Sequence, residues 1–104
     1  MSNDTKKFLF ISPPSDVKNK LKETAEKKNV NMSDLYNNDL RTFLQKSNQE
    51  IMNAPFLQSN DKKIKTRIQL EADVYDLLKE KAEETSFGNT QLFAKAIYSS
   101  ITEE

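Results

Sequence analysis

Two stretches of the chain alternate apolar with polar residues, and each then changes to the spacing of a helix. Within 63–70, one side of the alternation is apolar and the other is charged or amide-bearing: Ile64, Thr66, Ile68 and Leu70 against Lys65, Arg67 and Gln69. Residues 7–13 alternate in a similar way. A period of two residues is typical of a strand with one buried face, so we predict short strands over 7–13 and 63–70.

Each predicted strand leads directly into an amphipathic helix, predicted over 15–28 and 72–85. Apolar residues recur at four-residue intervals in both helices: Val17, Leu21 and Ala25, then Val74, Leu78 and Ala82. This spacing places them on one helical face, which we expect in the core. The residues at the two starts suit a helix N-terminus: Pro13, Pro14, Ser15 and Asp16 in the first, Glu71 and Asp73 in the second.

A second helix is predicted after a short break in each case. Asn29 is expected to take the left-handed conformation that ends a helix, whereas Ser86 is a poorer choice at the corresponding place. Asn31 and Gly88 fall at the N-cap positions of the next helices. The core residues of these helices are expected to be Leu35, Tyr36, Leu40, Phe43 and Leu44, and Leu92, Phe93, Ala96, Ile97 and Ile101.

The chain repeats itself at an offset of 57 residues, at which 10–44 lies over 67–101 without a gap. Nearly every apolar position matches, while few surface positions do. We therefore predict two copies of one packing unit, 7–44 and 63–101, which share a core and are joined by a linker over 45–62. Part of the linker is expected to contact the body through Ile51, Met52, Phe56 and Leu57.

One strand and two short helices, about 40 residues, bury too little apolar area to fold alone. Two such units fold together if their strands pair antiparallel and the four helices cover one face. The predicted fold is mainly α with a short two-stranded antiparallel β-ribbon, formed within one chain as an intramolecular pseudodimer. Strand pairing between two chains, which gives a homodimer, remains an open alternative.

Both units resemble the ribbon-helix-helix family of the Arc, MetJ and CopG type. The carrying residues are "TRIQLEADVYDLLKEKA" followed by "SFGNTQLF", and "LFISPPSDVKNKLKETA" followed by "NVNMSDLY". Members of this family normally build the structure from two identical chains. The tandem arrangement resembles the single-chain forms found among conjugation accessory proteins of the TraY kind.

The resemblance implies binding to double-stranded DNA, with the ribbon in the major groove and the starts of the second helices on phosphates. Arginine recognises guanine and glutamine recognises adenine through paired hydrogen bonds. The implied base contacts are Lys65, Arg67, Gln69, Phe8, Phe10 and Ser12. The implied phosphate contacts are Lys6, Lys7, Lys63, Asn31, Met32, Ser33, Gly88, Asn89 and Thr90.

The first unit departs from this pattern, because Phe8 and Phe10 occupy its outer strand positions. One interpretation is that these rings contact thymine methyl groups, so that the protein reads an asymmetric, non-palindromic site. The other is that they bind a protein partner, because two neighbouring exposed phenylalanines are unusual on a soluble monomer. The Lys65–Arg67–Gln69 side also fits an ordinary solvated strand face, and Asn31 and Gly88 are helix caps before they are phosphate ligands.

Composition narrows the function. The formal net charge is zero, yet no acidic residue lies between 62 and 70, so a locally basic ribbon is compatible with it. The absence of Cys and His excludes thiol and histidine chemistry, and we expect neither an enzyme nor a cofactor. Without a long apolar run or a signal peptide, we expect a cytoplasmic protein that does not enter a membrane.

The predicted function is transcriptional regulation of the repressor kind. A relaxosome accessory protein that binds a transfer origin is the nearest alternative. A protein-interaction module, either antitoxin-like or an inhibitor, is the alternative from another class.

Overall fold

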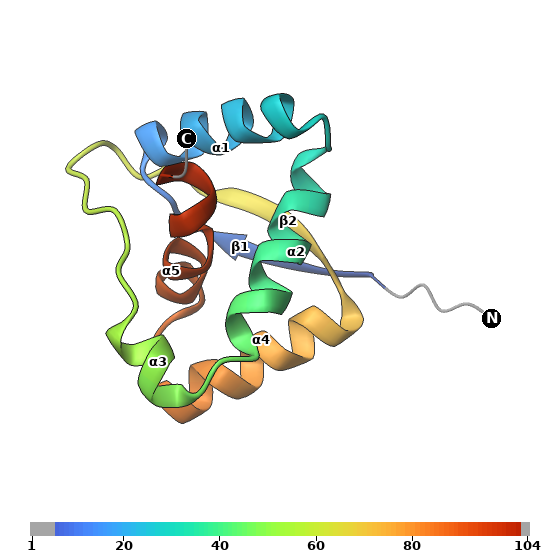
Figure 1. Ribbon diagram of the computed structural model, residues 1–104, viewed down its shortest axis with the longest axis vertical. Coiled ribbons are helices and arrows are strands. Elements are labelled where there is room, and N and C mark those ends of the chain that lie inside the picture. Colours follow the sequence, from blue (N-terminus) through green and yellow to red (C-terminus); the bar gives the residue numbers. More distant parts are fainter. Residues whose placement is uncertain (1–5, 103–104) are drawn as a thin grey trace.

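The protein is mainly helical with one two-stranded antiparallel sheet, and the computed structural model describes residues 6–102. Its elements are, in order, β1 (Lys6–Ile11), α1 (Ser15–Lys28), α2 (Met32–Leu44), α3 (Asn48–Asn53), β2 (Thr66–Glu71), α4 (Ala72–Thr85) and α5 (Asn89–Thr102). In Figure 1, α2 crosses in front of the two strands, with α1 above it and α4 below it. None of the helices in this described part is long and apolar enough to cross a membrane.

The two strands form a ribbon in which Phe10 faces Arg67, with regular pairs from Lys6–Glu71 to Ile11–Thr66. An isolated bridge between Pro14 and Lys63 continues the same register. The regular strands are therefore shifted from the predicted 7–13 and 63–70. Beyond Ile11 the ladder is interrupted, since two prolines lack an N–H and the Ser12 N–H donates to Thr90 Oγ1 at 3.2 Å.

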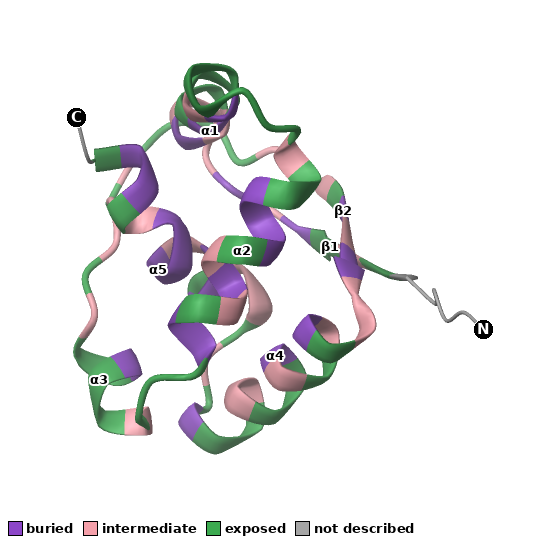
Figure 2. Cartoon of the chain, turned by 45° about the vertical axis from the view of Figure 1, so that its right-hand side comes forward, coloured by how far each residue is buried: buried purple, intermediate pink, exposed green. Residues whose placement is uncertain are grey.

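The ribbon has one buried and one exposed face, as its alternation predicts. Ile11, Ile68 and Leu70 point into the core, where they are at most 2% exposed. On the other face Phe8 and Phe10 are 51% and 57% exposed. All ten residues expected on the core faces of the second helices are buried (Figure 2). The helices thus cover only one side of the ribbon.

The ends of the predicted helices are close to those observed, and α1 and α4 match 15–28 and 72–85. Asn29 ends α1 with a φ of 58°, as expected, and Ser86 ends α4 in the same left-handed conformation with a φ of 65°. Asn31 caps α2, since its side chain accepts a hydrogen bond from the Asp34 N–H at 2.8 Å. The Gly88 carbonyl accepts the Leu92 N–H at 3.1 Å at the start of α5.

The segment predicted as a linker contains a helix, α3, that was not predicted. Six residues are too few to show a helical period, although Ser47 and Glu50 form a capping box that is readable in sequence. Ile51 is fully buried, as expected, and Leu57 packs against the core. The expectation for Met52 was wrong, because its side chain is 54% exposed and only its carbonyl is held by the body.

Candidate nucleic-acid interface

The uncovered face of the ribbon gathers the side chains predicted to contact bases. Phe8 lies opposite Gln69, and Phe10 lies opposite Arg67. Lys65 is exposed just before β2, and half-buried Ser12 follows β1. These positions alternate with buried Ile11, Ile68 and Leu70 because side chains along a strand point to opposite faces.

Cations from β2 and its approach stack on aromatic rings from β1. The Arg67 Cζ lies 3.8 Å from the centroid of the Phe8 ring, and the Lys65 Nζ lies 4.8 Å from that of Phe10. Both are diagonal neighbours across the ribbon, within reach of long side chains. Such contacts contribute about 0.5–1 kcal/mol at exposed sites and restrict the rotamers of the cations. The basic and aromatic residues are therefore interleaved instead of forming two separate rows.

The hydrogen-bonding side chains of the exposed ribbon face have no partner among the described residues. Lys65, Arg67 and Gln69 make no side-chain hydrogen bond or ion pair with any residue in 6–102. Arg41 provides the contrast, since it donates to both Glu71 and Asp73. These contacts lie at the end of β2 and the start of α4, so the guanidinium of Arg41 partly neutralises the acidic groups nearest the ribbon.

The start of α5 lies beside the ribbon and forms a second polar site. Lys63, Gly88 and Thr90 line a pocket of about 530 Å³ together with Ser12 and part of the 54–63 segment. The first turn of α5 contains no acidic residue, and Asn89 is half-buried there. An exposed lysine and a helix N-terminus in one pocket both favour a negatively charged group.

The start of α2 is less suited to an anion, although the resemblance implies the same role for it. Asp34 places a carboxylate in its first turn, and its N–H is already bonded to Asn31. Met32 is half-buried, with its sulfur 4.0 Å from the Tyr36 hydroxyl. Ser33 is exposed. The two predicted phosphate anchors are therefore chemically unequal.

The predicted contacts at the amino end of β1 are only partly described. Lys7 is exposed, and its Nζ lies 5.8 Å from the centroid of the Tyr75 ring. The backbone of Lys6 belongs to β1, but its side chain lies outside the described part of the molecule. Lys7 lies opposite buried Leu70, so it belongs to the helix side of the ribbon, beside the start of α4, and not to the exposed face.

Two residues that position the ribbon were missed in the sequence. The buried side chain of Asn37 accepts the Glu71 N–H at 2.9 Å and donates to the Gln69 carbonyl at 3.3 Å. Arg41, one helical turn later, holds Glu71 and Asp73. Its guanidinium lowers the pKa of the Asp73 carboxyl, mainly through hydrogen bonds. No local signal singles out Asn37, because Asn38 and Asp39 beside it are polar as well.

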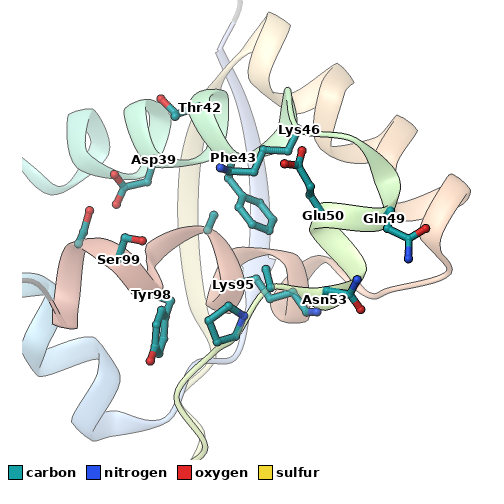
Figure 3. A pocket seen from close by; sticks show the side chains of 14 residues that line it. Asp39, Thr42, Phe43, Lys46, Gln49, Glu50, Asn53, Lys95, Tyr98 and Ser99 are labelled. Carbon is teal, nitrogen blue, oxygen red and sulfur yellow. The ribbon is translucent and has the colours of Figure 1, made fainter.

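A separate pocket of about 580 Å³ lies between α2, α3 and α5, on the side chains drawn in Figure 3. Buried Lys95 projects from α5 there and donates to the Ile51 and Met52 carbonyls at 3.1 and 3.0 Å. Burial lowers the pKa of Lys95. Lys95 therefore fastens α3 to α5. In a separate respect, no group of acidic residues within 6–102 is arranged to hold a metal ion.

Models of known protein families, curated proteins and solved structures were each compared with this chain, and none matches it.

Proposed function

We propose that this protein binds double-stranded DNA by placing its ribbon in the major groove, and that it acts as a transcriptional regulator of the repressor kind. The observation that carries the proposal is the exposed ribbon face, on which the side chains of Lys65, Arg67 and Gln69 have no hydrogen-bonding partner among the described residues. The major groove, about 12 Å wide, admits a two-stranded ribbon. Guanine O6 and N7 suit Arg67, and adenine N6 and N7 suit Gln69.

We further propose that the chain is a tandem ribbon-helix-helix pseudodimer. Helices α1 and α4 start and end 57 residues apart, which is the offset of the sequence repeat. Asn29 and Ser86, with the same separation, are the two residues with positive φ among those described. Phe10 and Arg67 are again 57 apart and face each other. A two-fold axis through an antiparallel ribbon pairs equivalent residues at its centre, so this register supports the proposal.

The phosphate backbone would be held mainly at one end. Lys63 and the N-terminal turn of α5 carry this role, with Lys7 on the other side of the ribbon. Asp34 weakens the equivalent anchor at α2. With few phosphate contacts and zero net charge, affinity should fall only moderately with salt.

The experiment is enrichment of a random duplex library by the protein, followed by mobility-shift titration of the enriched duplex. Arg67→Ala should lower specific affinity by about 1–3 kcal/mol, because it removes a bidentate base contact. Lys22→Ala, an exposed cation on α1, is the matched control and should leave affinity unchanged. The proposal is wrong if Arg67→Ala binds the enriched duplex as tightly as the unaltered protein.

The relaxosome alternative uses the same face and differs in its target. The position of the enriched sequence, at a promoter or at a transfer origin, separates the two.

A second candidate from another class is favoured by the exposure of Phe8 and Phe10. In this case the ribbon face is a protein-binding surface of an antitoxin-like or inhibitory module. Loss of a defined protein partner in Phe8→Ser/Phe10→Ser, with DNA affinity unchanged, would favour this candidate.

A further inference from the structure

We infer that Phe8 and Phe10 recognise the 5-methyl groups of thymine, and that each ring works with its stacked cation to select guanine next to thymine. The inference rests on the proposed function, because it concerns what the ribbon reads inside the groove. It assigns the aromatic positions a role in specificity that polar ribbon residues alone would not supply.

Both phenylalanine rings are exposed on the ribbon. Phe8 and Phe10 lie two positions apart on one strand and are each more than half exposed, on the face that no helix covers. Their buried neighbours show that apolar side chains on the opposite face do enter the core. Among the major-groove edges of the four bases, thymine presents a methyl group, which is the natural apolar partner for such a ring.

Each ring is stacked against a cation from the opposite side of the ribbon. The Cζ atom of Arg67 lies 3.8 Å from the centroid of the Phe8 ring. The guanidinium N–H groups of Arg67 nevertheless have no acceptor among the described residues. Each stack therefore presents a donor edge beside an apolar surface. Guanine offers two acceptors in the major groove, and an adjacent thymine offers a methyl group. The Lys65–Phe10 pair repeats this combination with a more flexible donor.

The spacing of the two rings along β1 is similar to that of two base-pair steps in a duplex. Two residues along a strand span about 6.8 Å, and successive base pairs rise by about 3.4 Å. The two stacks are thus positioned to meet steps roughly two base pairs apart. Gln69, opposite Phe8, is free to bind an adenine near the first stack. The expected site contains thymines near guanines, without two-fold symmetry.

The test replaces thymine by deoxyuridine in the duplex enriched from a random library. This change removes only the methyl group and leaves every hydrogen-bonding group in place. One lost methyl contact should lower affinity about fourfold, and two should lower it roughly 15-fold, from the transfer free energy of a methylene group. Deoxyuridine placed outside the footprint of the protein is the matched control and should have no effect.

Phe8→Ser/Phe10→Ser completes the cycle. Both rings are exposed, so the variant should remain folded at the assay temperature, although the loss of the two stacks should lower its thermal unfolding midpoint somewhat. It should bind the thymine duplex more weakly and no longer distinguish thymine from deoxyuridine. Equal binding of both duplexes by the unaltered protein, or an enriched site without thymine, overturns the inference and leaves the proposed function standing. Failure to enrich or shift any duplex overturns the proposed function itself.

Discussion

At the scale of single residues, Arg41 and Arg67 differ in whether their guanidinium groups form hydrogen bonds within the described protein. The guanidinium of Arg41 donates hydrogen bonds within the protein, to the carboxylates of Glu71 and Asp73. The guanidinium of Arg67 donates no hydrogen bond to the described residues and stacks on the ring of Phe8. A guanidinium held by stacking keeps its donors available, which is the state expected of a residue that awaits a ligand.

Lys63 gives a prediction at the same scale. Lys63→Ala should weaken binding to all duplexes about equally and lower the salt slope of log K by about 1, because the role proposed for Lys63 is contact with a phosphate and not with a base. Mobility-shift titrations of enriched and random duplexes at several salt concentrations measure both effects. An unchanged salt slope, with Lys22→Ala as the control, would remove Lys63 from the interface.

At the scale of elements, the ribbon is attached to α2 and α4 by polar contacts near Glu71. Asn37 satisfies the backbone at the end of β2, and Arg41 binds the carboxylates of Glu71 and Asp73. These contacts determine where the strand ends and α4 begins. None of the described acidic residues forms an ion pair with Lys65 or Arg67 on the ribbon face.

The ion pair predicts an acid-dependent loss of stability. Arg41 lowers the pKa of Asp73 in the folded state. The contribution of this ion pair to the free energy of unfolding is therefore complete above the unfolded pKa of about 3.9, and it is lost as pH falls through the lower folded pKa. Asp73→Asn should therefore cost less than about 1 kcal/mol at neutral pH, and the difference should shrink below about pH 4. Urea unfolding across this range measures it. Asp76→Asn, an exposed carboxylate on the same helix, should show no such loss.

Local patterns predicted the elements better than the contacts between them. The four-residue stripes of α1 and α4 and the cap at Asn31 are local, so their bounds could be predicted. The stacking of Arg67 on Phe8 depends on strand register, which no local pattern specifies. Asn37 and Lys95 bond to segments more than 30 residues away, so their partners could not be predicted from nearby residues.

At the scale of the whole molecule, the segment between α2 and β2 is part of the body. Ile51 of α3 is fully buried, and Lys95 holds the carbonyls at the end of this helix. Residues 54–63 then border the pocket at the start of α5. The segment between α2 and β2 therefore also shapes the surroundings of one candidate phosphate site.

Lys95→Met should release this connection. The substitution keeps the apolar stem but leaves two carbonyls without their charged donor. The net loss in the free energy of unfolding should be about 1–3 kcal/mol, because the lost hydrogen bonds outweigh the gain from no longer burying an ammonium group. Urea unfolding measures the loss, and faster tryptic cleavage at Lys62 or Lys63 reports local release. Lys46→Met, an exposed residue of the same pocket, is the control, and equal behaviour of both variants would contradict the role given to Lys95.

The pairing of Phe10 with Arg67 has one more consequence. Turning the molecule half a revolution over its target would exchange a ring for a guanidinium at the midpoint, so the two ways of landing differ in energy. A molecule bound to a duplex would then favour one of its two possible orientations. It would present α3 to the same flank at every site, and a second protein recruited there would meet upstream and downstream sides that are not alike.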